Sequence, residues 1–164
     1  MRHFRNLVAL LLLLAAAIPG PAVAQKVPGS ERCRAITRAE VRALFDHWNA
    51  ALATDDPDAV VRTYAPGAVL LPTVENGPLI GSGAIRGYFV SFLKKHPHGK
   101  IDTRTIGIGC NIAYDVGLYT FTLDGPVAGS RKQLHARYTY IYEPVHGRWL
   151  IVHHHSSVMP EAGH

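Results

Sequence analysis

The chain has 164 residues, of which 48% are hydrophobic and 18% are charged, and its formal net charge at neutral pH is +5. This length suits one domain with one hydrophobic core. The charge is mild and no run of lysine or arginine occurs, so the composition argues against a nucleic-acid partner.

Residues 1–24 have the pattern of a secretory signal peptide. Arg2 and Arg5 precede a short apolar run, which ends in the small-residue triplet Ala22-Val23-Ala24. A transmembrane anchor is the alternative, but the run is short for a bilayer and Pro19 to Pro21 interrupts it. We therefore expect cleavage after Ala24, export to the periplasm or the exterior, and no membrane partner afterwards.

The mature chain contains two cysteines, Cys33 and Cys110. In an oxidising compartment such a pair usually forms a disulfide, although two buried free thiols are the alternative. Cys33 lies in a polar arm, residues 25–36, that has little else to hold it. A bridge would close a long loop, which is worth about 4 kcal/mol in the chain-entropy model.

Three helices are predicted in the first half of the mature chain. Thr37 and Glu40 have the spacing of a capping box, and apolar residues recur at helical spacing behind them. Asp56 and Pro57 suit the start of a second helix, and Ser82 is a candidate cap for a third. Between the last two, residues 68–73 are expected to form a short strand and residues 75–83 a loop.

The second half changes to four strand-like segments rich in Ile, Val, Thr and Tyr, separated by Gly, Pro or Asp: 100–109, 111–123, 132–143 and 149–158. Helices followed by an antiparallel run predict an α+β domain. We expect a curved antiparallel sheet with helices on one face over residues 37–160, and a short tail at residues 161–164.

Three consecutive histidines lie in the last predicted strand. Strand alternation places His153 and His155 on one face and His154 on the other. If Glu143 pairs near Trp149, Arg137 lies opposite His155, and a cation there argues against a metal. Neither HExxH nor CxxC occurs, so we expect no metal and no cofactor. Structural or interface roles are favoured for His153 and His155.

The aromatic residues suggest a small-molecule pocket. Side chains of one strand face would meet those on the helices that cover the sheet, giving apolar walls with a few polar tips. The alternative is that they simply fill the core. The candidate pocket residues are Trp48, Tyr64, Tyr88, Phe92, Tyr138, Tyr140, His154 and Ser156.

The end of the chain resembles the association domain of calcium/calmodulin-dependent protein kinase II and its stand-alone bacterial relatives, within the nuclear transport factor 2-like superfamily. The resemblance rests on Gly147-Arg148-Trp149, the run Val152 to His155, and the exit Ser157 to Pro160. It implies a cone-shaped sheet around a pocket, an outer sheet face used for assembly, and framework or interface roles for Arg137, Trp149, His153 and His155.

The resemblance does not extend to kinase chemistry, because the chain lacks the HRD and DFG motifs. It also departs from the family at the pocket. Where the association domain of the kinase carries arginines that hold an anion, alignment on the Gly-Arg-Trp turn places Tyr140 and Ser156. A neutral ligand is therefore as well supported as an anionic one.

Two functional hypotheses follow. The first is an exported module that forms a homo-oligomer, a dimer or larger, and binds a small organic molecule in its cone. The second is an enzyme of the SnoaL or ketosteroid isomerase kind that transfers protons in the cone. In that case His154 is the candidate acid or base, and Tyr138 or Tyr140 is the candidate hydrogen-bond donor.

Overall fold

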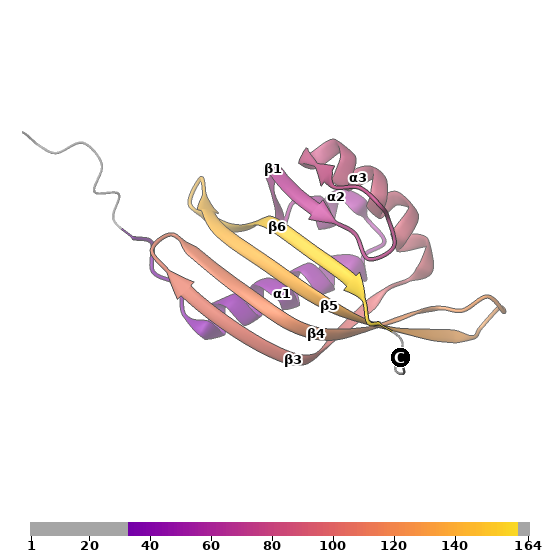
Figure 1. Cartoon of the computed structure of the whole chain (residues 1–164). Coiled ribbons are helices and arrows are strands. Elements are labelled where there is room, and N and C mark those ends of the chain that lie inside the picture. Colours follow the sequence, from indigo (N-terminus) through magenta and orange to yellow (C-terminus); the bar gives the residue numbers. More distant parts are fainter. Residues whose placement is uncertain (1–32, 161–164) are drawn as a thin grey trace, which may run out of the picture. The chain divides into compact units, whose positions relative to one another are not determined.

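The computed structural model describes residues 33–160, so the expected signal peptide, most of the arm and the tail lie outside the described residues. Helices come first and long strands last, as predicted (Figure 1). The elements are α1 (Arg38–Leu52), α2 (Pro57–Val61), β1 (Tyr64–Leu71), β2 (Leu79–Ile80), α3 (Gly81–Phe92), the 3-10 turn η1 (Leu93–Lys95), β3 (His98–Gly109), β4 (Ile112–Asp124), β5 (Arg131–Val145) and β6 (Arg148–Val158).

The caps of the first two helices are confirmed. The Thr37 hydroxyl accepts from the Glu40 backbone N–H, and the Glu40 carboxylate accepts from the Thr37 backbone N–H at 2.7 Å. Asp56 accepts from the N–H of Asp58 at 2.8 Å, with Pro57 in the first turn. These side chains satisfy donors that the first turn of a helix leaves free.

The predicted cap of the third helix is wrong. Helix α3 begins at Gly81, two residues before the start that a Ser82 cap implies, and its N-cap residue Ile80 makes no side-chain cap bond. Gly81 has a φ of +78°, which glycine adopts without strain, and this turn directs the chain into the helix. The Ser82 hydroxyl instead donates to the Pro66 carbonyl at 3.5 Å.

The six strands form one sheet in the order β2-β1-β6-β5-β4-β3. The four long strands are confirmed, and β3 to β6 pair antiparallel in sequence order. β1 is longer than expected and runs parallel to β6, while the predicted loop at 75–83 includes the short strand β2. Figure 1 shows the sheet curving in front of α1, so the predicted fold class, a curved sheet with helices on one face, is confirmed.

The predicted register between the last two strands is wrong by two residues. Arg137 lies opposite Ser157, and Thr139 lies opposite His155. One residue of the shift arises at the turn, where Pro144 rather than Glu143 pairs with Trp149. The second arises at a bulge between Ile151 and His153, because a bulge inserts one unpaired residue into a strand.

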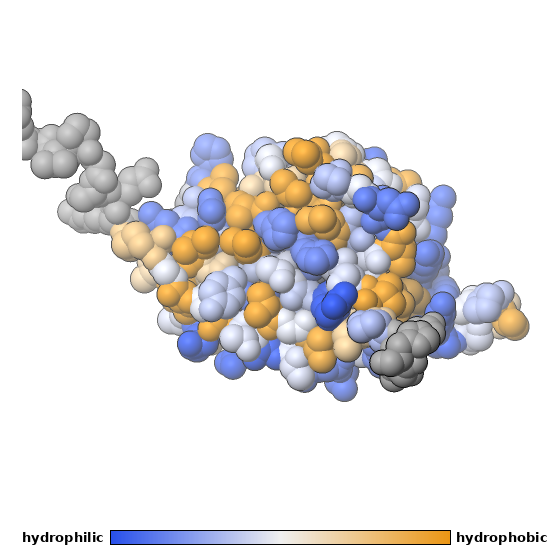
Figure 2. All heavy atoms as spheres, in the orientation of Figure 1, coloured by the Kyte–Doolittle hydropathy of each residue, from blue (hydrophilic) through white to orange (hydrophobic). Residues whose placement is uncertain are grey.

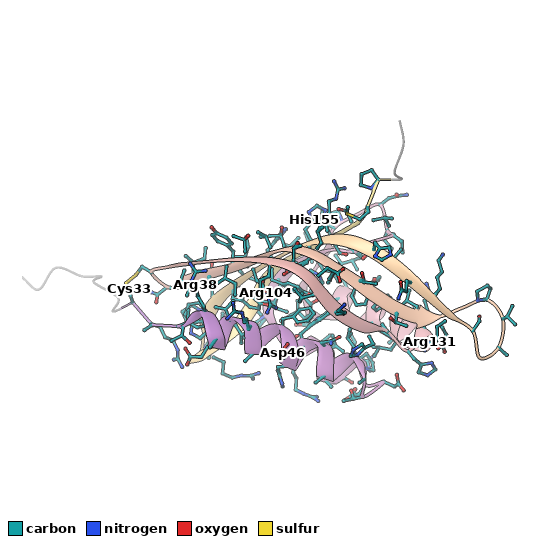
Figure 3. The ribbon with its side chains drawn as sticks, turned by 90° about the horizontal axis from the view of Figure 1, so that it is seen from below. Cys33, Arg38, Asp46, Arg104, Arg131 and His155 are labelled. Carbon is teal, nitrogen blue, oxygen red and sulfur yellow. A yellow bond between two sulfur atoms is a disulfide. The ribbon has the colours of Figure 1, made fainter. Side chains whose placement is uncertain are left out.

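The two faces of the sheet have different surroundings. The inner face packs against α1 and α3 and holds the core, whose largest fully buried side chains include Trp48, Tyr119, Tyr140, Tyr142, Phe89 and Phe121. No helix of residues 33–160 covers the outer face. Figure 3 shows His155 on the side of the sheet away from α1, and Figure 2 looks onto that face, where hydrophobic and polar residues are interspersed.

The free edge of β3 is covered by side chains of α1. Asn49 donates to the carbonyl of Gly99 and accepts from its N–H, both at 2.8 Å. Arg38 donates to the carbonyl of Ile106. Unpaired strand edges invite pairing with another chain, so these contacts block the edge of β3 against strand addition.

The expected disulfide is confirmed. Cys33 is bonded to Cys110 in the turn between β3 and β4. Beside it, the Arg34 backbone N–H donates to the Asn111 side chain at 2.7 Å. Together these contacts fix the end of the arm to the sheet. Among the described residues, no helix is both long and apolar enough to cross a membrane.

Candidate functional site

A small cavity lies on the inner face of the sheet, between the sheet and helices α1 and α3. Its free volume is about 10 Å³, enough for one water molecule. The walls are mostly aromatic with a polar side formed by His154, Ser156 and Thr73. The lining residues are Trp48, Leu70, Pro72, Thr73, Tyr88, Phe89, Phe92, Tyr119, Phe121, His154 and Ser156.

The structure brings five of the predicted pocket residues to this cavity, namely Trp48, Tyr88, Phe92, His154 and Ser156. The other three, Tyr64, Tyr138 and Tyr140, are buried behind the walls. Tyr140 stacks on the His154 ring with centroids 4.1 Å apart and planes 23° from parallel. These aromatic residues therefore support the cavity from the core.

His154 ends a chain of buried hydrogen bonds. The indole N–H of Trp48 donates to the Tyr64 hydroxyl oxygen at 3.1 Å, and that hydroxyl lies 2.8 Å from Nδ1 of His154. The second ring nitrogen, Nε2, is buried and has no partner among the described residues. An unpartnered buried polar atom is costly. Because His154 also lines the cavity, its Nε2 is a candidate contact for a molecule bound there.

Burial, together with the nearby His153 and His155, lowers the pKa of His154 to about 3. The imidazole is therefore neutral near pH 7. Its environment also differs from that expected of an acid or base paired with Tyr138, because the Tyr138 hydroxyl points to Asp115 instead, at 2.9 Å. The catalytic roles of His154, Tyr138 and Tyr140 stay predictions.

Sequence reasoning missed two hydroxyl residues of the cavity, Tyr119 and Thr73. The Tyr119 hydroxyl donates to Ser156 at 2.5 Å, and Thr73 is hydrogen-bonded to the same serine oxygen. Burial raises the pKa of Tyr119, which therefore stays protonated. Tyr119 shares the inner face of β4 with Phe121, and that alternation was the available signal. No local pattern marks Thr73.

A second polar cluster lies on the inner face towards β3. The Asp115 side chain is fully buried, and its two oxygens lie 3.1 and 2.9 Å from nitrogens of the Arg104 guanidinium. The Tyr138 hydroxyl donates to the same carboxylate. Burial raises the pKa of Asp115, while the Tyr138 hydrogen bond and the Arg104 charge oppose that rise. Figure 3 shows Arg104 between the sheet and α1.

This cluster depends on a close approach between strands. Arg104 lies opposite Gly117 after an irregularity in the β3–β4 register. A Cβ atom at Gly117 would lie only 2.0 Å from the Thr103 carbonyl oxygen, so only glycine fits there. None of the cavities described here is lined by Asp115, so we assign the cluster to packing.

A wider groove adjoins the small cavity, with a volume of about 460 Å³. The two hollows share Thr73, Tyr88 and Phe92, and the rings of Tyr88 and Phe92 are stacked with centroids 5.4 Å apart. Leu123 and Leu134 add apolar wall, and lysines stand at the rim. The groove and the cavity therefore adjoin at these three side chains, with His154 on the cavity side.

The predicted interface residues lie in two places. His153 and His155 are on the outer face, as expected from strand alternation, and the Arg137 guanidinium donates to the Ser157 hydroxyl there at 3.1 Å. Burial and the neighbouring His155 lower the pKa of His153. Trp149 differs, because it packs against the core beside Leu44 of α1.

The outer face carries an apolar row across four strands. Tyr114, Ile141, His153 and Val69 are cross-strand neighbours in that order from β4 to β1. Val116, Thr139 and His155 form the adjacent row. Tyr114 is 45% exposed, and Ile141 and Val69 are partly exposed. Within residues 33–160, no group of three or more His, Cys, Asp or Glu residues could hold a metal ion.

The curved sheet, its helices and the enclosed cavity define the nuclear transport factor 2-like class of folds, also called cystatin-like. A nuclear transport factor 2-like protein from Salmonella enterica matches with a TM-score of 0.65 and 18% identity, over 76% of this chain and 92% of that one. A ketosteroid isomerase-like protein from Erwinia carotovora matches with a TM-score of 0.62 and 15% identity, over 75% and 96%. At these identities the likeness concerns the fold alone.

The chain belongs to the calcium/calmodulin dependent protein kinase II association domain family, whose model matches residues 37–160. It is similar to a protein from Xanthomonas campestris, provisionally named as such an association domain, with 47% identity and a TM-score of 0.72 over 79% of this chain and 96% of that one. The resemblance inferred from the C-terminal motif is confirmed. No curated protein matches the sequence at a significant level.

Proposed function

We propose that this chain is an exported, non-kinase association module that forms a homo-oligomer through the outer face of its sheet and binds a small organic molecule in its cone. The observation that carries the assembly part is the row of Tyr114, Ile141, His153 and Val69 on a face that no described helix covers. Burying such a face against a second copy removes apolar surface from water.

The geometry of the sheet favours assembly through its face over assembly through its edges. Arg38 and Asn49 already occupy hydrogen-bonding groups on the free edge of β3. The opposite edge is the two-residue strand β2, which offers little backbone for pairing. A contact between copies is therefore best made by side chains of the outer face.

Export is supported by two independent features. The N-terminal residues have the charge, apolar run and small-residue triplet of a signal peptide. Cys33 and Cys110 form a disulfide, and such bonds persist in oxidising compartments. Edman sequencing of the protein recovered from its host tests the proposal, with Gln25 expected as the first residue.

The ligand part is supported by the cavity and groove on the inner face. Apolar walls with a few polar groups are typical of small-molecule sites. The enzymatic alternative has less support, because Nδ1 of His154 is already hydrogen-bonded to Tyr64 and a pKa of about 3 makes the ring a poor proton carrier near neutrality.

The assembly is tested with a matched pair of substitutions. Val116→Glu adds a charge beside the apolar row, whereas Val127→Glu adds the same charge to the β4–β5 hairpin, where Val127 is 69% exposed. Sedimentation equilibrium at pH 8 should give a multimer for wild type and Val127→Glu, and a monomer for Val116→Glu. A monomeric wild type, or a Val116→Glu multimer of unchanged size, would contradict the proposal.

A further inference from the structure

The hydrogen bonds that reach His154 have one direction. The indole of Trp48 can only donate, so the Tyr64 oxygen accepts from it. The single hydroxyl hydrogen of Tyr64 then goes to Nδ1 of His154, since the reverse arrangement would leave that hydrogen without an acceptor. Nδ1 is thus the acceptor nitrogen, and a neutral ring carries its hydrogen on Nε2.

Tyr64 holds the Nδ1 edge of the ring, which leaves the Nε2 edge for the small cavity. His154 lines that cavity, whereas Tyr64, which holds Nδ1, is not among its walls. His154 is 3% exposed, and Nε2 has no partner among residues 33–160. The cavity therefore presents a fixed N–H donor, oriented from behind by Tyr64 and Trp48.

We infer that His154 recognises the oxygen of a neutral, carbonyl-bearing apolar ligand, with Tyr64 and Trp48 as positioning residues. This inference rests on the proposed ligand site and specifies its chemistry. The free volume of about 10 Å³ admits one oxygen-sized group at His154. The remainder of the ligand lies in the groove of about 460 Å³, reached past the shared wall of Thr73, Tyr88 and Phe92.

The site disfavours ligands whose group at His154 is a hydrogen-bond donor. An ammonium group would meet the Nε2–H donor of His154 and would lose its hydration in an aromatic enclosure. A hydrocarbon would leave the N–H unpartnered. A carbonyl oxygen accepts from Nε2 and needs no proton transfer.

The tautomer is tested first, by ¹⁵N-detected NMR of histidine-labelled protein at pH 7. We expect a protonated Nε2 and an unprotonated Nδ1 for His154. Tyr64→Phe removes the donor to Nδ1 and should shift the Nδ1 resonance, whereas Tyr142→Phe should leave it in place. A hydrogen on Nδ1 in the wild type would overturn the inference and leave the proposed assembly untouched.

Ligand choice is tested with three compounds of one skeleton: 4-phenyl-2-butanone, butylbenzene and 4-phenylbutan-2-amine. We expect the ketone to bind about tenfold more tightly than butylbenzene, as one added hydrogen bond allows, and the amine most weakly. His154→Phe should abolish the preference for the ketone, and His155→Gln should preserve it.

The results separate the inference from the proposed function. Equal binding of ketone and hydrocarbon would mean that Nε2 meets only water, which overturns the inference while a ligand site remains. Binding of none of the three compounds would overturn the inference and the ligand part of the proposed function together. Tyr64→Phe keeps the test valid if His154→Phe does not fold, because it should also reduce the preference for the ketone.

Discussion

The inner face of the sheet holds two buried polar clusters. They differ in whether their polar groups are paired within the cluster. In the Asp115 cluster, both carboxylate oxygens lie within 3.1 Å of Arg104 and Tyr138 adds a hydrogen bond, so the charges are matched internally. In the His154 chain, two hydrogen bonds lead to a nitrogen that has no partner within residues 33–160. A closed cluster stabilises the fold, whereas an open one is available to a ligand.

The largest expected loss of stability comes from a substitution in the Asp115 cluster. Asp115→Ala leaves the Arg104 charge buried without its partner, and such a loss typically costs about 3 to 5 kcal/mol. Urea denaturation monitored by circular dichroism measures it. Replacing both residues, as Arg104→Met with Asp115→Leu, should cost less because no charge remains unpaired. If Asp115→Ala lowers the free energy of unfolding by less than about 1 kcal/mol, the Asp115 cluster does not stabilise the fold as proposed.

The disulfide secures the arm at the β3–β4 turn. Replacing Cys33 and Cys110 together with serine should lower the free energy of unfolding by about 2 to 4 kcal/mol, because the unfolded chain regains the freedom of a 77-residue loop. Reduction of the wild type by dithiothreitol should produce a similar loss in thermal unfolding. Unchanged stability in both experiments would mean that the bond is not formed in solution.

The buried ring of His154 should make the stability of the fold depend on pH. The pKa of His154 falls from 6.5 to about 3 on folding, so its contribution to stability is complete above pH 6.5 and is lost as the pH falls towards 3. Between pH 6.5 and 5 this amounts to about 2 kcal/mol. Chemical denaturation at these two pH values measures it.

The matched variants for the pH experiment are neighbours on one strand. His154→Gln should remove most of the difference between pH 6.5 and 5, whereas His155→Gln, on the outer face, should retain it. The same slope in His154→Gln and in the wild type would place the titrating group elsewhere.

The smallest expected change in stability distinguishes Tyr64 from Tyr142. Tyr64→Phe breaks the chain and leaves Trp48 and His154 without partners, at a cost of about 1 to 2 kcal/mol. Tyr142→Phe removes a buried hydroxyl that has no partner among the described residues, so its stability should be unchanged or slightly higher. Thermal unfolding of the two variants tests the difference, and equal losses would contradict the proposed chain.

The sequence was sufficient for features that depend on local patterns. Alternation along one strand placed His154 inside and His155 outside, and the spacing of Thr37 and Glu40 gave the first helix start. The C-terminal motif identified the family, and two cysteines behind a predicted signal peptide indicated the disulfide.

Features that depend on contacts between strands could not be predicted from the sequence. The pairing of Pro144 with Trp149 at the turn and the bulge before His153 together moved the partner of Arg137 from His155 to Ser157. Neither feature can be seen in the alternation of one strand alone. Pairing of Arg104 with Asp115 depends on the β3–β4 register and on Gly117. Tyr64 was placed in the pocket, but its contact with Trp48 sets it behind the wall.

The most direct test of the account is native mass spectrometry of the mature chain and of Val116→Glu, each equilibrated with 4-phenyl-2-butanone. In the proposed function, the outer face of the sheet carries the assembly and the inner face binds the ligand. We therefore expect a wild-type multimer with one bound ketone per chain, and a Val116→Glu monomer that still carries the ketone. A wild-type monomer, or loss of the ketone together with assembly in Val116→Glu, would contradict this separation of the two faces.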